Sequence, residues 1–334
     1  MHRTGPANLS QIAQELGLSV TTVSRALKDG PEVHPDTRAR VKAVAARVGY
    51  VPNLAGRALR TGQTRNLTAI LPLETRDYLS DLAKLPLIEG MTLAAQDRGY
   101  ALAIASTTPE EDPLSGLMRV LRSGATDGVI ITRIVAADPR LPFLMERRFP
   151  FVAFGRSDLD LDHASVDVEN EAIVEDASRR LIAEGCRRIA LQLLVPHDHV
   201  SAMRLVGYRG AMEAAGLSVD PALIGEGAYT IEASEAWLAR LLDLPTPPDG
   251  LICANELGLI GAVGALRARN MHPGRDLKII VRDSTGLSRR VVSNVGVHFV
   301  DMADIGSQLI EALVSAIEDP SAPRLKSLVK ATYM

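Results

Sequence analysis

The sequence predicts a small all-helical head joined to a larger α/β core that contains two doubly wound parallel sheets. Its 334 residues exceed the roughly 250–300 at which a single hydrophobic core stops growing. The first 65 residues contain short helical patterns, whereas the remainder alternates short apolar runs with amphipathic helices. Near-continuous apolar strands separated by helices are typical of parallel sheets covered on both faces. The number of such strands favours two sheets over one.

The charged residues are distributed unevenly on the two sides of the same boundary, near residue 65. Residues 1–65 carry ten Lys and Arg against four Asp and Glu, and the remaining residues carry 27 against 36. A basic head on an acidic body is expected when only the head faces phosphates. Neither a signal-peptide pattern nor a run of about 18 uncharged apolar residues is present. We therefore expect a cytoplasmic, soluble protein without a membrane partner.

The first helix of the head has apolar residues at the spacing of one buried face, at Leu9, Ile12, Ala13 and Leu16. Asn8 or Ser10 can cap it, and Gly17 can end it in a left-handed conformation. Ser19 can cap a second helix, in which Val23, Ala26 and Leu27 face inward. This arrangement leaves several side chains available to a partner: Val20, Thr21, Thr22, Ser24 and Arg25.

A third helix is expected after Pro35 and Asp36, running to the motif "ARVGY". Three short helices around one small core make a helix-turn-helix domain. The next segment, "VPNLAGRALRTGQTR" at residues 51–65, can begin a short helix at Pro52 and Asn53. Gly56 weakens that helix by about 1 kcal/mol relative to Ala, so we expect a linker whose helix is marginal on its own.

The core strands are expected at residues 67–72, 101–105, 127–131, 151–154, 188–193, 250–254, 277–282 and 295–298. Helices are expected between them at 87–98, 114–123, 171–184, 203–215, 234–242 and 257–268. In such folds, ligands bind at the carboxyl ends of the strands. A ligand cleft is therefore expected there.

The head resembles the LacI/GalR family of bacterial transcription regulators, because "VSRAL", "TRARV", "GY.PN" and "A..LRTG" occur in the family's order and spacing. The resemblance continues through "EGCRRIAL", "MRLVGYRGAMEAAGL" and "ICANELGLIGAVGALRARN" and covers nearly the whole chain. It implies a DNA-binding domain at 1–50, a hinge helix and linker at 51–65, and an effector-binding and dimerisation core at 66–334. The core would resemble periplasmic sugar-binding proteins.

The same resemblance implies a core of two subdomains. The N-subdomain would comprise residues 66–160 and 292–322, and the C-subdomain residues 162–290. The chain would cross between them near 156–164, 288–294 and 318–327. Members of the family act as homodimers on approximately palindromic operators, so double-stranded DNA is the expected macromolecular partner.

In a helix-turn-helix, the second helix enters the major groove with its N-terminal residues against base edges. Val20 can contact or exclude a thymine methyl group, and Arg25 can pair with guanine O6 and N7. The hydroxyls of Ser19, Thr22 and Ser24 suit phosphate oxygens. The alternative is a three-helix packing module with a polar surface.

The family motif in the hinge implies that Leu59 inserts into the minor groove and kinks the duplex, flanked by Arg57 and Arg60. Asn53 is expected to contact DNA as well. The alternative is an amphipathic helix that buries Leu54, Ala58 and Leu59 against the core.

The expected effector is a sugar or a sugar derivative, and for its site the resemblance points to Tyr78, Asp198, Arg204, Tyr229, Asn255 and Asp283. Such sites combine an aromatic face with planar bidentate donors and carboxylates. The sequence departs from the family at "VRD", residues 281–283, where "GYD" is usual, and at Glu256, where Asp is usual. These departures leave the effector's identity open.

The sequence gives little support for a calcium site, another metal site or a redox site. The segment 158–169 places Asp158, Asp160, Asp162 and Glu169 at calcium-loop positions, but His163 stands where the loop requires Gly. His197 and His199 could bind a metal, although a loop at the edge of the cleft is the simpler interpretation. Cys186 and Cys253 fit no metal or redox spacing, so both are expected to be reduced thiols in or near the core.

We therefore expect a ligand-responsive transcription regulator, a repressor of carbohydrate uptake or catabolism genes, with no catalytic residues, cofactor or metal. The first alternative is a solute-binding protein of periplasmic type, against which the basic head argues. The second is an enzyme on an α/β scaffold, for which the fold alone offers no support.

Overall fold

A computed structural model describes residues 8–50, 63–73, 81–108, 110–194, 199–225 and 230–334. The chain divides into two compact units, Met1–Thr64 and Arg65–Met334, which we call the head and the core. Each is described by itself.

The head contains three helices, α1 (Leu9–Leu16), α2 (Val20–Ala26) and α3 (Pro35–Arg47). Asn8 caps α1, and Gly17 ends it with a φ of 65°, a left-handed conformation that glycine adopts without strain. Ser19 caps α2. The three helices share one small core: Ile12, Ala13, Val23, Ala26, Val33, Val41 and Ala45. The predicted helix-turn-helix is confirmed within these residues.

The core contains two six-stranded sheets. Sheet A has the order β11-β5-β4-β3-β1-β2 and is parallel throughout. Its strands are β1 (Asn66–Ile70), β2 (Ala101–Ala105), β3 (Gly128–Ile131), β4 (Phe151–Phe154), β5 (Ala164–Val168) and β11 (Lys326–Val329).

Sheet B has the order β12-β10-β9-β8-β6-β7 and is parallel except for the pairing of β10 with β12. Its strands are β6 (Ile189–Gln192), β7 (Ile224–Gly225), β8 (Gly250–Cys253), β9 (Lys278–Asp283), β10 (Gly296–Phe299) and β12 (Thr332–Tyr333). All eight strands expected from the sequence are present, together with the shorter or more polar β5, β7, β11 and β12.

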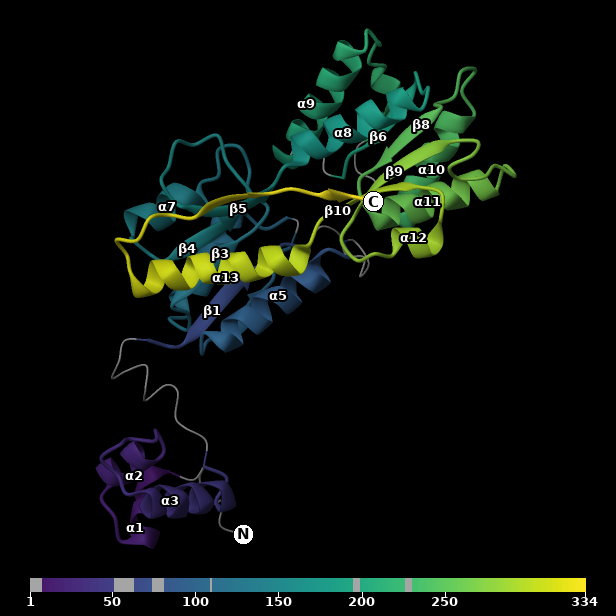
Figure 1. Cartoon of the computed structure of the whole chain (residues 1–334). Helices are drawn as coiled ribbons and strands as arrows, with labels where there is room; N and C mark the ends of the chain where they lie inside the picture. Colours follow the sequence, from purple (N-terminus) through teal and green to yellow (C-terminus); the bar gives the residue numbers. More distant parts are fainter. Residues whose placement is uncertain (1–7, 51–62, 74–80, 109, 195–198, 226–229) are drawn as a thin grey trace. The chain divides into compact units, whose positions relative to one another are not determined.

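Helices cover both faces of each sheet, which explains why the strands are apolar on both sides. On sheet A, α5 (Lys84–Asp97) and α13 (Met302–Glu318) lie on one face, as Figure 1 shows. The opposite face is covered by α6 (Pro113–Arg122) and α7 (Arg140–Glu146).

Sheet B has α8 (Asn170–Ala183) and α9 (His199–Ala214) on one face and α10 (Ile231–Leu242) and α11 (Glu256–Arg267) on the other. A short 3-10 helix, η1 (Pro221–Leu223), precedes β7, and α12 (Ser288–Val291) precedes β10.

The described chain passes between the sheets three times, and each passage lies later than the resemblance implied. The first follows β5 instead of lying near 156–164, because β5 pairs with β4 in sheet A. The second follows β10 instead of lying near 288–294, because β10 pairs with β9 in sheet B. The third lies between β11 and β12 instead of near 318–327; Figure 1 shows this yellow C-terminal segment running along sheet A before it reaches sheet B.

Candidate functional sites

One face of α2 is exposed along its whole length in the isolated head. Val23 and Ala26 are fully buried, and this fixes the rotation of the helix. As a result Val20, Thr21 and Arg25 lie at the surface, and Val20 is 43% exposed although it is apolar. An exposed valine beside a threonine and an arginine is a surface that can contact base edges.

The N-terminus of α2 is held by two hydroxyl groups. The Ser19 hydroxyl accepts a hydrogen bond from the Thr22 N–H at 3.0 Å, and the two side-chain oxygens lie 2.8 Å apart. Ser24 is partly exposed one turn further along. Ser19 and Thr22 therefore stabilise the helix start and keep hydrogen-bonding capacity for a further partner.

Arg25 has an acidic neighbour in the head. Its Nε lies 3.3 Å from a carboxylate oxygen of Glu32, and both side chains are about half exposed. Such a surface ion pair is weak, so Arg25 can exchange this partner for another at little cost.

Several predicted site residues lie outside the described residues. In the hinge these are Asn53, Arg57, Leu59 and Arg60, and in the core they are Tyr78, Asp198 and Tyr229.

A cavity of about 180 Å³ lies between the two sheets of the core. Its lining includes Leu71 after β1, Phe154 at the end of β4 and Asp167 in β5 on the sheet A side. On the sheet B side, Arg204 from α9 and Arg282 from β9 contribute. The cavity therefore occupies the carboxyl ends of both sets of strands, as the sequence predicts.

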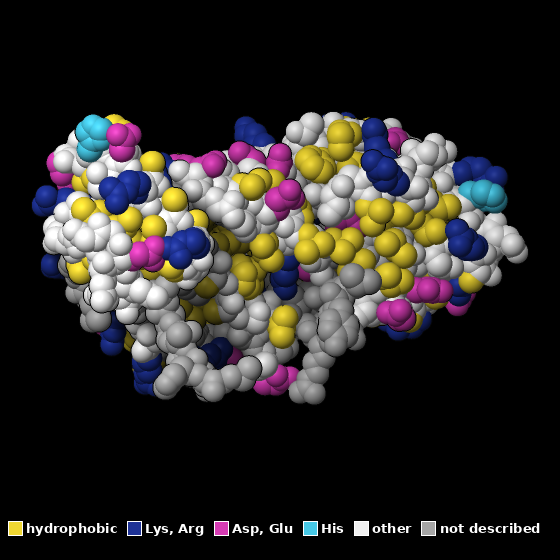
Figure 2. All heavy atoms as spheres, turned by 90° about the horizontal axis from the view of Figure 1, so that it is seen from below, with side chains coloured by type: hydrophobic (Ala, Val, Ile, Leu, Met, Phe, Trp, Pro, Cys, Tyr) yellow, Lys and Arg dark blue, Asp and Glu magenta, His cyan; other side chains and the backbone are white. Residues whose placement is uncertain are grey.

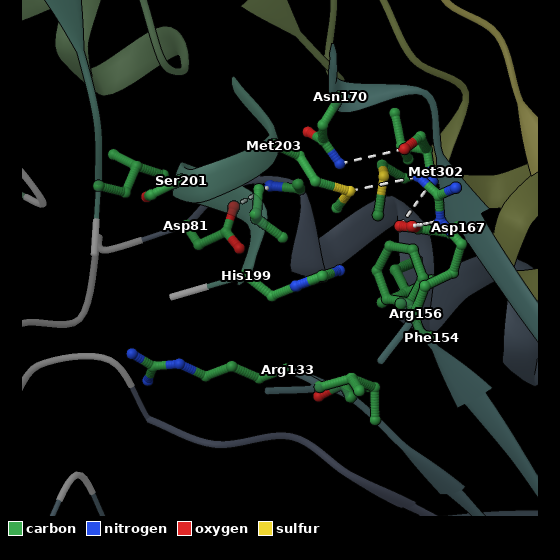
Figure 3. A pocket seen from close by; sticks show the side chains of 18 of the residues that line it. Asp81, Arg133, Phe154, Arg156, Asp167, Asn170, His199, Ser201, Met203 and Met302 are labelled. Carbon is green, nitrogen blue, oxygen red and sulfur yellow. Dashed lines mark hydrogen bonds and ion pairs between the residues drawn. The ribbon is translucent and has the colours of Figure 1, made fainter. Parts of the chain in front are cut away.

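Arg156 is held on the sheet A side of this cavity and contacts the other half of the core. The Arg156 Nε donates to Asp167 at 2.7 Å, and its Nη2 lies 3.2 Å from the Met203 sulfur on α9. Figure 3 shows Arg156, Asp167 and Met203 gathered on one side, while Arg133 extends away from them.

Arg204 is placed where an effector could reach it. It is only 8% exposed, lines the cavity and donates from Nε to the Asn170 side-chain oxygen at 3.1 Å. Its guanidinium is held in position by the first residue of α8.

Asn255 and Asp283 lie outside the lining of the cavity, and their side chains instead stabilise a helix start and a turn. Asn255 caps α11 by accepting the Gly258 N–H at 2.9 Å. Asp283 is fully buried and accepts N–H groups that follow β9, from Thr285, Gly286 and Ser288. Neither residue is among those that line the cavity.

The pKa of Asp283 reflects these contacts. Burial alone would raise it, but hydrogen bonds from the Glu256 side chain and from the loop N–H groups bring the pKa down to about 2. Asp283 is therefore ionised at neutral pH, with its charge satisfied by the turn that it stabilises.

Comparisons with known proteins match both units. Residues 8–53 match the model of bacterial regulatory proteins of the lacI family, and residues 178–334 match a periplasmic binding protein-like domain. The regulator RafR of Escherichia coli is 32% identical over 328 residues, covering 96% of this chain and 94% of RafR. The regulator AglR of Rhizobium meliloti is 35% identical over 279 residues, covering 83% of this chain and 78% of AglR. The chain belongs to the LacI family.

A solved structure with a LacI-family fold supports the architecture. The Lac repressor bound to ONPG superposes with a TM-score of 0.85 at 18% identity, over 99% of this chain and 98% of that one. As a LacI-family member, the protein is a DNA-binding transcriptional regulator. Within the described segments, no helix combines the length and apolar character needed to cross a membrane.

Sequence reasoning missed several cavity residues of this LacI-family core, namely Arg133, Phe154, Arg156, Asp167 and Arg282. His199, which was expected in a loop at the edge of the cleft, lines the cavity as the first residue of α9. A usable signal existed for three of the missed residues. Arg133 follows β3, and Phe154 and Arg156 lie at the end of β4, where the rule on carboxyl ends of strands places ligand contacts. Asp167 could not be found, because "ASVDV" was not recognised as a strand.

The weaker motifs have structural roles in the described parts of the chain. His163 is buried and stacks on Phe151 at 5.4 Å between ring centroids. The described residues contain no cluster of His, Cys, Asp and Glu able to hold a metal. Cys186 and Cys253 are free and buried, and burial raises the pKa of the Cys186 thiol to about 11.

Proposed function

We propose that this LacI-family regulator is a repressor of carbohydrate uptake or catabolism genes. It would bind an approximately palindromic operator as a homodimer in the cytoplasm, and a small effector in the core cavity would control its affinity for that operator. The observation that carries the proposal is the exposed face of α2 in a folded helix-turn-helix. A solute-binding protein would not require a helix-turn-helix head. Catalysis is not part of the proposed role.

In the proposed complex, α2 lies in the major groove. Val20, Thr21 and Arg25 would contact base edges, with Arg25 leaving Glu32 to form a bidentate pair with guanine. Ser19, Thr22 and Ser24 would contact phosphates and set the position of the head. The hinge residues Asn53, Arg57, Leu59 and Arg60 are proposed to bind the minor groove, with Leu59 as the inserted wedge.

The proposed effector is a sugar or a sugar derivative. A solved LacI-family relative is described as a CelR–cellobiose complex; it is 24% identical to this chain with a TM-score of 0.73, over 98% of each chain. Arg204 is the proposed contact supported by the cavity. Tyr78, Asp198 and Tyr229 remain proposed contacts, whereas Asn255 and Asp283 would act through the loops they hold.

Exposed apolar side chains support a homodimer. Figure 2 shows hydrophobic side chains interspersed with charged and polar ones in the view that it draws. On the N-terminal half of the core, the exposed ones include Leu85 at 67% and Leu93 at 56% on α5, and Ile104 at 43% on the edge strand β2. A second copy could cover such a surface.

Selection of operators from a randomised DNA pool, followed by fluorescence anisotropy, tests the proposal. We expect a palindrome to be enriched, with salt-sensitive affinity that one sugar or sugar derivative weakens. Arg25→Ala should cost about 1–3 kcal/mol on the selected sequence and relax preference at one position in each half-site. Arg40→Ala removes the same charge from the exposed surface of α3 and should leave sequence preference unchanged. Enrichment of no sequence at any salt concentration would contradict the proposal.

A further inference from the structure

The strand β12 attaches the third passage between the sheets to sheet B, and its attachment is short. It pairs with β10 over two residue pairs, and backbone hydrogen bonds of 2.8 and 3.2 Å join Met334 to Val297. Only two residues separate the end of β11 at Val329 from the start of β12 at Thr332. The contacts that hold β12 in sheet B therefore also tie sheet B to sheet A.

The side chain of Tyr333 seats β12 against its neighbours. Its ring centroid lies 5.0 Å from that of His298 in β10, and the Arg180 guanidinium of α8 lies over the ring at 3.6 Å from the centroid. Its hydroxyl oxygen lies above Gly296, where an added Cβ would meet it at 2.6 Å. Tyr333 thus contacts both the adjacent strand and the helix that covers the sheet.

His298 is buried beside this ring, with 3% exposure, and binds one carboxylate. Its Nε2 lies 2.8 Å from Asp176 Oδ2, the same oxygen that accepts a hydrogen bond from the Arg180 Nε at 2.6 Å. An ionised carboxylate can only accept, so Nε2 carries the proton and Nδ1 is the acceptor of a neutral imidazole. Nδ1 is itself buried and has no hydrogen-bond partner among the described residues.

These surroundings favour the neutral form of His298. Burial lowers the pKa of His298, the hydrogen bond to Asp176 opposes this shift without cancelling it, and the Arg180 charge adds to it. Burial would raise the pKa of Asp176, but the hydrogen bonds from Arg180 and His298 bring it below its usual value, so Asp176 is ionised. A proton on Nδ1 would create a buried N–H for which the described residues offer no acceptor.

The other titratable groups near His298 do not favour its protonation. Arg282 is its neighbour in the pairing of β9 with β10. His298 also borders a small cavity within sheet B that is lined by Arg204 of α9 and Cys253 of β8. Burial raises the pKa of the Cys253 thiol and keeps it neutral. Among the described neighbours, Asp176 is therefore the source of negative charge.

Detachment of β12 is the smallest opening that brings water to this ring. β12 is an edge strand, and Tyr333 covers His298 on that side. The ring's other neighbours, α8 and β9, contribute to the hydrophobic core through Val174, Ala177 and Ile280. Local openings that break few buried contacts cost the least free energy. A protonated His298 is therefore relieved most easily by the loss of β12 from the sheet.

We propose that β12, with Tyr333, is an acid-sensitive latch between the two halves of the core. The latch stays in sheet B while His298 is neutral and detaches when the ring takes up a proton and water. Detachment leaves the first two passages of the described chain to connect the halves. The latch needs neither operator nor effector, so it stands independently of the proposed function.

The pH range follows from the two states of the ring. With β12 detached, His298 is exposed and its pKa returns to about 6.5; with β12 attached, the pKa is lower. Attachment is therefore most stable above pH 6.5 and weakens as the pH falls from that value towards the pKa of the attached state. The attachment equilibrium should change by up to about tenfold for each pH unit in this range.

Hydrogen exchange of the full chain, read by mass spectrometry, tests the latch at pH 7.5, 6.5 and 5.5. Labelling times are scaled to the intrinsic exchange rate at each pH. A peptide covering residues 326–334 reports on β12, and one covering 302–318 reports on α13 as a reference for global stability. We expect β12 to be protected at pH 7.5 and to lose up to about tenfold of that protection by pH 5.5, while α13 is unchanged.

Variants assign the effect to His298 and Tyr333. His298→Gln keeps an N–H for Asp176 without titrating, so β12 should stay protected at pH 5.5. His272→Gln removes an exposed histidine from the same half and should keep the wild-type loss. Tyr333→Ala should expose β12 at every pH, whereas Thr332→Ala, at an exposed position of the same strand, should not. Melting temperatures establish that each variant is folded.

Several results would overturn the proposal. In the wild type these are an unprotected β12 at pH 7.5, no loss of its protection by pH 5.5, or a simultaneous loss in α13, which would indicate global unfolding. Among the variants they are an equal loss in His298→Gln, or a loss that His272→Gln abolishes. If His298→Gln does not fold, Tyr333→Ala still decides, because a protected β12 without the ring would show that Tyr333 does not hold the strand.

Discussion

At the scale of single residues, we expect Glu32 to limit how readily Arg25 reaches DNA. The two side chains form an exposed ion pair at 3.3 Å. Since such pairs are worth at most about 1 kcal/mol, Glu32→Gln should raise operator affinity by up to about fivefold.

The control for this prediction is Glu15→Gln, which removes the same charge from α1, where Glu15 pairs with Arg47. Both variants gain general attraction to phosphates, so only the difference between them reports the release of Arg25. Anisotropy titrations on operator and non-operator DNA measure that difference. Equal gains in the two variants would show that Glu32 does not restrain Arg25.

The second prediction at this scale concerns Glu256 and the dependence of folding stability on pH. Burial raises the pKa of this carboxyl, and the neighbouring Asp283 raises it further. The folded protein therefore holds the Glu256 proton more tightly than the unfolded chain, whose pKa is about 4.3. The stability contributed by this proton is present below that value and is lost as pH rises through the folded-state pKa.

Glu256→Gln removes this titration and keeps an oxygen for the Ser284 N–H, which Glu256 accepts at 2.7 Å. The variant should become more stable relative to the wild type as pH rises above the unfolded pKa, and this relative gain should level off once pH passes the folded-state pKa of Glu256. Urea unfolding between pH 4.5 and 8 measures the difference. Asp283, with a pKa of about 2 in the wild type, titrates below this range. Parallel stability curves would contradict the assignment.

At the scale of secondary-structure elements, α5 and α13 cross closely because each has a glycine at the contact. A Cβ on Gly90 would overlap the Ala303 carbonyl, and a Cβ on Gly306 would overlap the Leu87 carbonyl. Gly90→Ala should therefore destabilise the core by about 1–3 kcal/mol, although alanine favours helix formation.

Gly210→Ala on α9 is the matched control, because an added Cβ there meets no atom within 4 Å. It should stabilise the protein by about 0.5–1 kcal/mol. Differential scanning calorimetry of both variants measures the opposite shifts. A stabilised Gly90→Ala variant would mean that the two helices separate more easily than their packing indicates.

The elements also show what could be predicted from the sequence. Apolar strands such as β3 and β8 were found because burial on both faces leaves a continuous apolar run. β5 was missed because Ser165 and Asp167 interrupt that run, although all five of its residues are buried. Asp167 tolerates burial because it pairs with Arg156, which is a tertiary contact that no local pattern reveals.

The candidate site follows the same logic. Arg204 was predicted from the resemblance and lines the cavity, whereas Asp283 was predicted equally and holds a turn. The residue next to it, Arg282, lines the cavity instead. Adjacent residues of a strand point to opposite faces, so a family motif locates the strand end more reliably than the side chain that faces the ligand.

At the scale of the whole molecule, regulation requires the effector cavity and the DNA-binding head to be coupled through one equilibrium. If the effector lowers operator affinity by a given factor, thermodynamic linkage requires the operator to lower effector affinity by the same factor. Typical coupling energies of about 1–3 kcal/mol correspond to factors of about 5–150. The two factors should therefore equal each other, and both should fall within this range.

Both factors can be measured on the full-length protein at one salt concentration. Anisotropy gives operator affinity with and without saturating effector, and calorimetry gives effector affinity with and without saturating operator. Non-operator DNA of equal length is the control, since phosphate binding by the basic head alone is not expected to carry the coupling. If operator affinity fell while effector affinity were the same on free and operator-bound protein, the cavity would not be the site through which that effector acts. Equal factors would place the cavity and the head in a single two-state mechanism, with the contacts between the two halves of the core as the element that both ligands bias.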